Sequence, residues 1–315
     1  MIWAKTFKDG RAKSLRDHGL DVAAVAHVWQ ALHQDRVARE ADTLGVDPAA
    51  LAGIRTFFAS LHDLGKCSRA FQQKVPALWP EEFGGLREFA DKAHWRLSAR
   101  LLNEPQIKTD LLQGLPGLHV DDFRAIVAAI AGHHGEPPED TDFDKVKLTG
   151  KTAPIGAAAL EAARGLVEVF RTVLNPPPLS GLNNARASAL SWQLSGLITL
   201  ADWVGSDADH FGPVDSGLLA GDYFELAKEQ AYKALAAKGL IAQGPTEAPG
   251  LAAVSPNAAA HPRPMQSHAD TLKLPEGPCL IMIEDTTGSG KTEAALALAA
   301  RMMAAGKGEG VYFAL

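Results

Sequence analysis

Apolar residues recur at helical spacing through most of the first 240 residues. In the stretch 15–34 they fall three and four residues apart, which is the period of an α-helix with one buried face. The same spacing returns in 47–66, 86–102, 121–134, 157–175, 188–206 and 223–238. Because no stretch of this region alternates apolar and polar residues, we expect residues 1–240 to form an all-α domain.

The pattern changes near residue 240. Residues 241–277 are rich in Pro, Ala and Gly, with six prolines, and this composition is typical of a linker. Residues 278–284 are an apolar run of strand length, followed by a glycine turn and a helical stretch over 293–305. A second apolar run begins at 310. We therefore expect 278–315 to be the first βαβ piece of a larger α/β domain, because such a unit alone cannot cover both faces of its sheet.

Composition and charge narrow the classes of protein. A length of 315 residues fits one large domain or two smaller ones. The net charge of −6 excludes a basic surface over the whole molecule, so any nucleic acid would be attracted by a local patch or by bound metal. No apolar run is long enough for a membrane span, and the N-terminus lacks the apolar core of a secretory signal. Two widely separated cysteines favour a reducing cytoplasm.

Polar residues interrupt the apolar faces of the predicted helices at five places. These residues are His18, His62, His94, His134 and Asp202, and Asp63 and His133 lie directly beside two of them. A helix that buries a polar side chain must give it a partner, and five helices of one bundle could bring these side chains to one point. Neutral imidazoles with a few carboxylates are the ligand set of transition metals. Taken together, the seven residues predict a metal site.

A single histidine on an apolar face has a simpler interpretation. Taken alone, such a residue is more often a core histidine bonded to a backbone carbonyl or a carboxylate. We keep that interpretation for His27, His33, His119, His210, His261 and His268. The metal hypothesis rests on the joint pattern of the other five histidines and two aspartates, which is much harder to explain by chance.

Three segments carry a resemblance to a known family. The order of His18, HDLGK, His94, AGHHG and Asp202 resembles the ligand set of the HD superfamily, whose fold is a helical bundle. The wider segments HGLDVAAVA, LHDLGKCSRAFQ and LADWVGSD are similar to the N-terminal HD nuclease of the CRISPR-associated helicase-nuclease of type I systems, in the subtype that works with the Cascade complex. This likeness covers nearly the whole chain once the C-terminal EDTTGSGKTEAAL is included.

The resemblance implies two divalent metal ions, and five histidines among seven ligands suit the transition metals Mn, Fe, Co or Ni better than Mg²⁺. It places His18, His62, Asp63 and Asp202 on one ion, with Asp63 bridging to a second ion that His94, His133 and His134 complete. It also implies single-stranded DNA as the substrate and a Cascade-type RNA-guided surveillance complex as a partner. Lys66, one turn beyond Asp63, could hold the phosphate that is cut, and Asp63 and Lys66 are our candidate catalytic residues. The alternative for Lys66 is an ordinary lysine facing the C-terminus of a helix.

A phosphate-binding loop follows the first predicted strand of the C-terminal part. Gly288, Ser289, Gly290, Lys291 and Thr292 stand between a strand and a helix, as such a loop requires. The loop resembles the start of a RecA-like motor of superfamily 2 helicases, and Gln266 resembles the adenine-reading glutamine of that family, or is a plain linker residue. Asp285 stands where the strict pattern has glycine. No second acidic motif and no arginine finger follow, so we expect no ATP hydrolysis from these residues, and a role for ATP and Mg²⁺ only in a full-length motor.

Two other functions remain open at this point. The same HD pocket could serve a phosphohydrolase of nucleotides or cyclic dinucleotides, and the chain could also be an inactive docking module. The adjoining helicase loop favours the nuclease, because a motor feeds a strand and has no use for a mononucleotide. The complete set of seven ligands argues against an inactive module.

Overall fold

The structure is a computed structural model that describes residues 1–89, 93–120, 122–213, 217–241, 249–308 and 310–312. It separates into two compact units, Met1–Ile241 and Ala242–Leu315. Within the described residues, no helix has both the length and the apolar character needed to cross a membrane.

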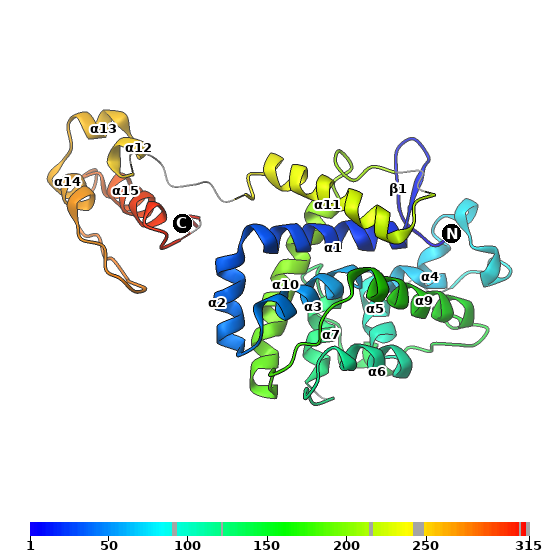
Figure 1. Ribbon diagram of the computed structural model, residues 1–315. Coiled ribbons are helices and arrows are strands. Elements are labelled where there is room, and N and C mark those ends of the chain that lie inside the picture. Colours follow the sequence, from blue (N-terminus) through cyan, green and yellow to red (C-terminus); the bar gives the residue numbers. More distant parts are fainter. Residues whose placement is uncertain (90–92, 121, 214–216, 242–248, 309, 313–315) are drawn as a thin grey trace. The chain divides into compact units, whose positions relative to one another are not determined.

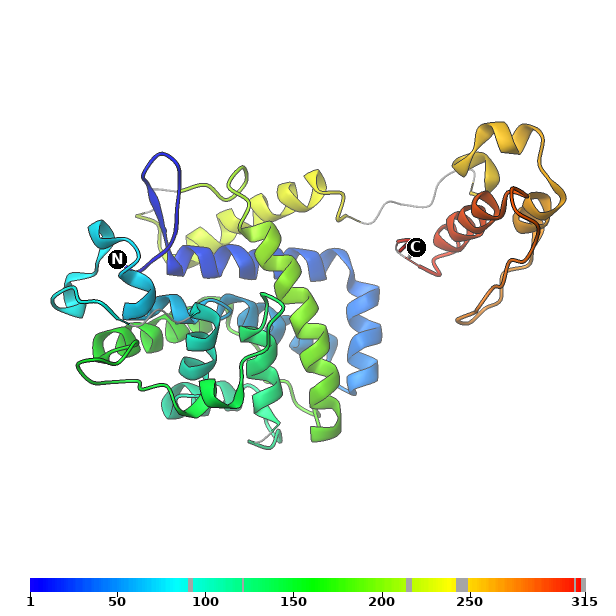
Figure 2. The same cartoon turned by 180° about the vertical axis from the view of Figure 1, so that it is seen from behind.

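The first unit is mainly helical, and a long central helix organises it. Helix α1 (Leu15–Leu32) packs against α3 (Pro48–Ser60), α10 (Asn184–Gly205) and α11 (Ala220–Ala237), which surround it in Figures 1 and 2. The remaining helices are α2 (Gln34–Leu44), α4 (Arg69–Gln72), α5 (His94–Leu102), α6 (Pro105–Gln113), α7 (Phe123–Ala131), α8 (Asp140–Asp144) and α9 (Ala157–Leu174), with short 3-10 helices η1 (Leu64–Cys67), η2 (Pro76–Leu78) and η3 (Glu81–Phe83). The expected mainly helical fold is therefore confirmed.

Helix α1 is buried on all sides in its first half, not on one face as its spacing predicts. Every residue from His18 to Ala26 is buried, so the helix has no solvent face over more than two turns. Its start is fixed by Ser14, whose hydroxyl accepts a hydrogen bond from the backbone N–H of Asp17 at 3.0 Å. Helix α3 begins in the same way at Asp47, which accepts from Ala50 at 2.8 Å. These two caps set the starts of the helices that lead to His18 and His62.

The expectation that residues 1–240 contain no strand is wrong. Strands β1 (Trp3–Thr6) and β2 (Ala12–Ser14) form an antiparallel hairpin in which Lys5 lies opposite Lys13. Strands of four and three residues are too short to show an alternating pattern, so the sequence gives little sign of them. The hairpin packs on α1, and its place in the fold is visible at the N-terminus in Figure 1.

The helix predicted over 121–134 ends at Ala131, and two further predicted helices are also shorter than expected. The helix predicted over 47–66 ends at Ser60, and a turn and η1 follow. The helix predicted over 86–102 begins only at His94, since residues 86–89 are not helical and 90–92 lie outside the described residues. Helical spacing continued through both segments because residues of a turn can also face the core, and periodicity does not distinguish the two cases.

The second unit contains more helix than predicted. Part of the predicted linker 241–277 is helical, in α12 (Leu251–Val254), α13 (Pro256–Ala260) and α14 (Pro264–Thr271), while 242–248 lie outside the described residues. Two of these helices begin with proline at the first helical position, where its missing N–H is harmless, so two of the six prolines that suggested a linker instead start helices. Helices α12 and α14 pack on α15 (Lys291–Ala304) around a small core that contains Ala269 and Leu298.

The predicted strand at 278–284 is also not formed. Among the described residues of this unit no strand is present, although Ile281 and Ile283 pack towards α15 while Leu280 and Met282 are 90% and 84% exposed. This alternation is that of a strand, but a strand requires a neighbour to take its backbone hydrogen bonds. Residues 310–312 likewise have no regular structure, and 313–315 lie outside the described residues.

Candidate metal centre and phosphate-binding loop

All seven predicted metal ligands meet at one place in the first unit. His18 comes from α1, His94 is the first residue of α5, and Asp202 lies in the last turn of α10. The two adjacent pairs, His62–Asp63 and His133–His134, lie in turns that follow α3 and α7, not on helix faces as predicted. The potential ligand atoms form three overlapping groups, each within 4.8 Å: Asp63 with His94, His133 and His134; His18 with His62 and Asp63; and His62 with His133 and Asp202.

Asp63 lies at the centre of this cluster, with its two oxygens facing different histidines. Its Oδ2 is 3.1 Å from Nε2 of His18 and 3.3 Å from Nε2 of His62. Its Oδ1 is 3.0 Å from Nε2 of His94 and 3.6 Å from Nε2 of His133. A carboxylate that turns one oxygen to each of two ligand groups has the arrangement needed to bridge two ions.

Asp202 closes the cluster on the side of α10. Its Oδ1 is 3.4 Å from Nε2 of His62 and 3.8 Å from Nε2 of His18. The same oxygen accepts a hydrogen bond of 2.9 Å from the hydroxyl of Ser206, which caps the C-terminus of α10. Asp202 is therefore oriented by its own helix towards the histidines of two other elements.

The backbone fixes the tautomers of two histidines. Nδ1 of His62 lies 2.9 Å from the carbonyl of Ala59, and Nδ1 of His133 lies 3.2 Å from the carbonyl of Ile130. A carbonyl can only accept, so each Nδ1 carries the proton, and each Nε2 is left with a lone pair directed into the cluster whenever the ring is neutral. Within the described residues, these two Nε2 atoms and Oδ1 of Asp63 have no hydrogen-bond partner of suitable geometry.

These unpartnered buried atoms fit a metal site. A buried polar atom without a partner destabilises a fold by about 1–3 kcal/mol, so several at one point require an explanation. Five imidazoles and two carboxylates are suitable ligands for first-row transition metals. The residues present thus match in chemical type the ions that the resemblance implies.

The charged states of the cluster are strongly perturbed. Burial would raise the pKa of Asp63, but Lys66 and His62 outweigh it and hold that pKa well below its usual range. Burial would also raise the pKa of Asp202, but the imidazole of His62, 3.4 Å away, outweighs it and lowers that pKa. Both carboxylates are therefore ionised, as metal ligands must be.

The histidines divide into two groups. Burial lowers the pKa of His18 to about 4, so its ring is neutral at physiological pH. Burial also lowers the pKa of His134. For His62, burial is outweighed by Asp63 and Asp202, which together raise the pKa to about 10 when only protons compete for the site. A cation at this position is thus strongly favoured by the two carboxylates.

A close backbone approach holds two of the contributing elements together. The backbone N–H of Gly65 in η1 donates to the hydroxyl of Ser98 in α5 at 2.8 Å. A Cβ on Gly65 would lie 1.9 Å from the carbonyl oxygen of His94 and 2.5 Å from the backbone nitrogen of Ser98. Only glycine permits this contact, which sets His94 beside Asp63.

Lys66 points back to the centre of the site. Its Nζ is 2.6 Å from Oδ2 of Asp63. The side chain therefore lies among the predicted ligands, rather than over the C-terminus of a helix as in the alternative interpretation.

Sequence reasoning missed two residues near the cluster. Ser206 lies four residues after Asp202, and this helical spacing could have suggested it. Lys5 donates to the backbone carbonyl of Ser206 from strand β1, a contact between residues 201 positions apart that no local pattern reveals. The six histidines assigned to ordinary packing lie outside the three ligand groups; for example, His33 stacks on Trp29 and His210 is 3.2 Å from Asp207.

In the second unit, the predicted phosphate-binding loop precedes α15. Gly288 and Gly290 have φ of 78° and 90°, a left-handed conformation that favours glycine. Lys291 begins the helix, and its Nζ donates at 2.7 Å to the carbonyls of Asp285 and Thr286. The ammonium thus folds back over the loop.

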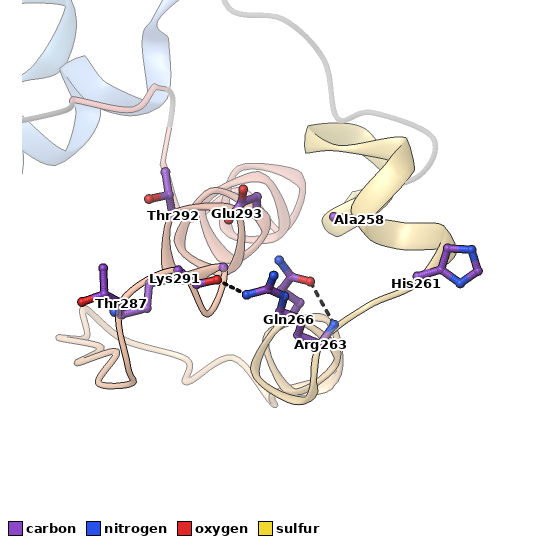
Figure 3. Close-up of a pocket in the computed structure, with 10 residues that line it drawn as sticks. Ala258, His261, Arg263, Gln266, Thr287, Lys291, Thr292 and Glu293 are labelled. Carbon is purple, nitrogen blue, oxygen red and sulfur yellow. Dashed lines mark hydrogen bonds between the residues drawn. The ribbon is translucent and has the colours of Figure 1, made fainter.

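Gln266 lies beside this loop. It is buried at the side of a cavity of about 520 Å³ that Thr287, Gly290, Lys291 and Thr292 also line (Figure 3). Its Oε1 accepts from the backbone N–H of Arg263 at 3.0 Å, and Arg263 in turn donates to the carbonyl of Gly288. The bond from Arg263 is the capping box of α14, in which the third residue of the helix accepts from the N-cap backbone, so it also suits a plain linker glutamine.

Comparison with known proteins gives a consistent result for both units. Residues 3–211 match the family described as "Cas3, HD domain". The chain is 31% identical to the CRISPR-associated endonuclease/helicase Cas3 of Thermus thermophilus over all of this chain and 34% of that protein. It is 28% identical to the protein of the same description from Escherichia coli, over 95% of this chain and 36% of the relative. The chain thus spans about a third of the length of these curated relatives.

Solved structures are similar in fold. A crystal structure of T. fusca Cas3 with AMPPNP is 25% identical with a TM-score of 0.68, covering 96% of this chain and 34% of that one. The Thermus thermophilus Cas3 HD domain in the presence of Ni²⁺ is 27% identical with a TM-score of 0.53, covering 73% of this chain and 88% of that one. A chain of a CRISPR RNA-guided surveillance complex, described as pre-nicking, is 24% identical with a TM-score of 0.63, over 96% of this chain and 35% of that one.

Proposed function

The chain belongs to the Cas3 HD-domain family, and on that premise we propose that residues 1–241 form a metal-dependent nuclease that cuts single-stranded DNA in CRISPR type I antiviral defence. The observation that carries the proposal is the cluster around Asp63, in which seven potential ligands from five parts of the fold converge.

The division of the cluster supports a two-ion arrangement. His18, His62, Asp63 and Asp202 would hold one ion, and His94, His133 and His134 would complete a second that shares Asp63. Two divalent ions bound there would supply an activated water on one side and stabilise the leaving oxygen on the other. Two aspartates return only two of the four positive charges, so the pocket would stay positive in a protein of net charge −6 and attract a phosphodiester.

The exposure of the ligands supports single-stranded DNA as the substrate. His134 is exposed and the side chain of His94 is 18% exposed, whereas His18 and His62 are almost fully buried. Substrate would therefore approach on the side of the second ion. We infer that Lys66 acts with Asp63 there, holding the phosphate that is cut. A flexible single strand can place its backbone in such a pocket, whereas the backbone of a stacked duplex cannot easily enter.

The partner and the location follow from the family. We infer docking on a Cascade-type RNA-guided surveillance complex and action in the cytoplasm, because the curated relatives are described as CRISPR-associated. We also infer that the second unit binds ATP through Lys291, Thr292 and Gln266 in a longer motor. Cutting itself requires none of these residues.

The test is cleavage of circular single-stranded DNA by metal-stripped protein after addition of Mn²⁺, Co²⁺ or Ni²⁺. We expect nicking and then shortening of the circle, with intact circular duplex left largely uncut. An Asp63→Ala variant should lose activity by more than about 100-fold, because even the loss of a residue behind a ligand costs about 10–100-fold. Asp35→Ala, an exposed aspartate of α2, is the matched control and should cut at the wild-type rate.

Two results would favour another function. Hydrolysis of nucleotides or cyclic dinucleotides without cleavage of DNA would indicate a phosphohydrolase. Protein that binds no metal and cuts no phosphodiester would be a docking module.

A further inference from the structure

The N-terminal hairpin turns two lysines towards the interior of the first unit. Lys5 and Lys13 are directly opposite each other on β1 and β2, so their side chains lie on the same face of the hairpin. Lys13 is buried and forms an ion pair with Asp21 of α1, while the hydroxyl of Tyr223 in α11 donates to the other oxygen of Asp21 at 2.9 Å. This buried network anchors the hairpin to two helices.

Lys5 has a different environment. Its Nζ donates to the backbone carbonyl of Ser206, whose hydroxyl donates to Asp202 at 2.9 Å. Lys5 is thus one residue removed from a predicted metal ligand. Among the described residues, no carboxylate lies within ion-pair distance of its Nζ. An ammonium has three donors, and the Ser206 carbonyl takes one of them.

Charged residues of the metal-ligand cluster also act on Lys5. Burial and then the charges of Lys13 and Lys66 lower its pKa, whereas Asp202 and Asp207 raise it. Lys66 is ion-paired with Asp63 at the centre of the cluster, and Lys5 is connected to Asp202 through Ser206. Lys66 is thus engaged by a carboxylate, whereas Lys5 is engaged by a backbone carbonyl and lies 5.8 Å from the centre of the Phe7 ring.

We propose that Lys5 is a strand-binding residue that holds a backbone phosphate of the DNA next to the one being cut. The hairpin serves as its support: Lys13 fixes the strands, and the opposite position presents an ammonium that is connected to Asp202 through Ser206. This inference rests on the proposed function, since it concerns a substrate with more than one phosphate. A lysine suits this task because it binds phosphate as a point charge without a fixed geometry.

The test compares Lys5→Gln, Lys5→Arg and Lys8→Gln in the full chain. Lys8 is an exposed lysine in the turn of the same hairpin, so its substitution removes the same charge from the same element. Each protein is assayed on single-stranded DNA at several salt concentrations and on bis(p-nitrophenyl) phosphate, a diester with a single phosphate. Bound metal is measured for each protein.

We expect Lys5→Gln to raise KM for DNA roughly three- to tenfold, with kcat little changed, because one charged hydrogen bond to the strand is lost. The salt dependence of binding should fall by about 0.7 in logarithmic slope, the value of one phosphate contact to a single strand. Hydrolysis of the small diester and metal content should be unchanged. Lys5→Arg should behave as wild type, and Lys8→Gln should keep the wild-type slope.

Three results would overturn the inference. Lys5→Gln with wild-type KM and salt slope on DNA would show that Lys5 touches no phosphate. An equal loss on DNA and on the small diester would show that Lys5 acts on Asp202 and not on the strand. Wild-type protein that hydrolyses the small diester but neither binds nor cuts DNA would overturn the proposed function itself, and this inference with it.

Discussion

At the scale of single residues, the site is defined by the type of its ligands. Five of the seven are imidazoles, and two of these are held by backbone carbonyls so that Nε2 faces the cluster. Mg²⁺ prefers oxygen ligands and retains several waters, whereas imidazole suits the later transition metals. The composition of the site should therefore decide which metal supports the reaction.

We expect metal-stripped protein to cut single-stranded DNA at least about tenfold faster with Mn²⁺, Co²⁺ or Ni²⁺ than with Mg²⁺ at equal concentration. The measurement is the initial rate on circular single-stranded DNA, with His27→Ala as a control because His27 lies outside the cluster against Phe224. Equally fast cleavage in Mg²⁺ after rigorous removal of other metals would contradict this expectation.

The ligands of the site could be predicted from the sequence, but the contacts that distant residues make with them could not. The joint pattern of His18, His62, Asp63, His94 and Asp202 was visible because each interrupts or adjoins an apolar stretch. Lys5 was not visible, because its role depends on a hairpin of seven strand residues that packs near the far end of α10. A contact between distant parts of a chain leaves no local periodicity.

At the scale of elements, the turns that follow two helices supply four of the seven potential ligands. The pairs His62–Asp63 and His133–His134 follow the ends of α3 and α7, where the backbone leaves the helix. Adjacent residues of a helix point about 100° apart and could not both face one site as readily. Periodicity predicted continuous helices here because these buried turn residues keep the helical spacing, and only the structure separates the two.

Gly65 provides the sharpest test at this scale. Gly65→Ala places a methyl group against the backbone of His94 and Ser98, and backbone cannot move aside as a side chain can. We expect unfolding free energy to fall by about 1–3 kcal/mol and metal occupancy to fall with it, since η1 and α5 must separate. Chemical denaturation and metal analysis measure the two effects. Gly85→Ala, with open space around its Cβ, is the control, and a Gly65→Ala protein equal to it in both measurements would exclude this close contact.

At the scale of the whole molecule, the two units have separate cores. The cluster of buried apolar residues in Met1–Ile241 is extensive, while that of Ala242–Leu315 contains few residues and leaves Leu280 and Met282 exposed. The prolines of 241–277 predicted a linker where part of the chain is helical, because proline both breaks helices and starts them. Only packing on α15 distinguishes the two roles.

The loop before α15 should not influence cutting by these 315 residues. Lys291 can contact phosphate, but the sequence provides no second acidic motif and no arginine finger to position water and neutralise the transition state. We expect equal rates of DNA cleavage for wild type and Lys291→Ala, with or without ATP, and no ATP turnover in either. ATP hydrolysis that single-stranded DNA stimulates and Lys291→Ala abolishes would show a working motor.

The proposed bridging of two ions by Asp63 predicts a number of bound metal ions that can be measured without any substrate. If its two oxygens serve two ions, metal-stripped protein should bind two equivalents of Ni²⁺ per chain, and Asp63→Ala should fail to retain either tightly. Equilibrium dialysis with elemental analysis gives this number directly, with Asp35→Ala as the variant that keeps two. Saturation of the wild type at a single ion, or two ions retained by Asp63→Ala, would contradict the bridged two-metal site.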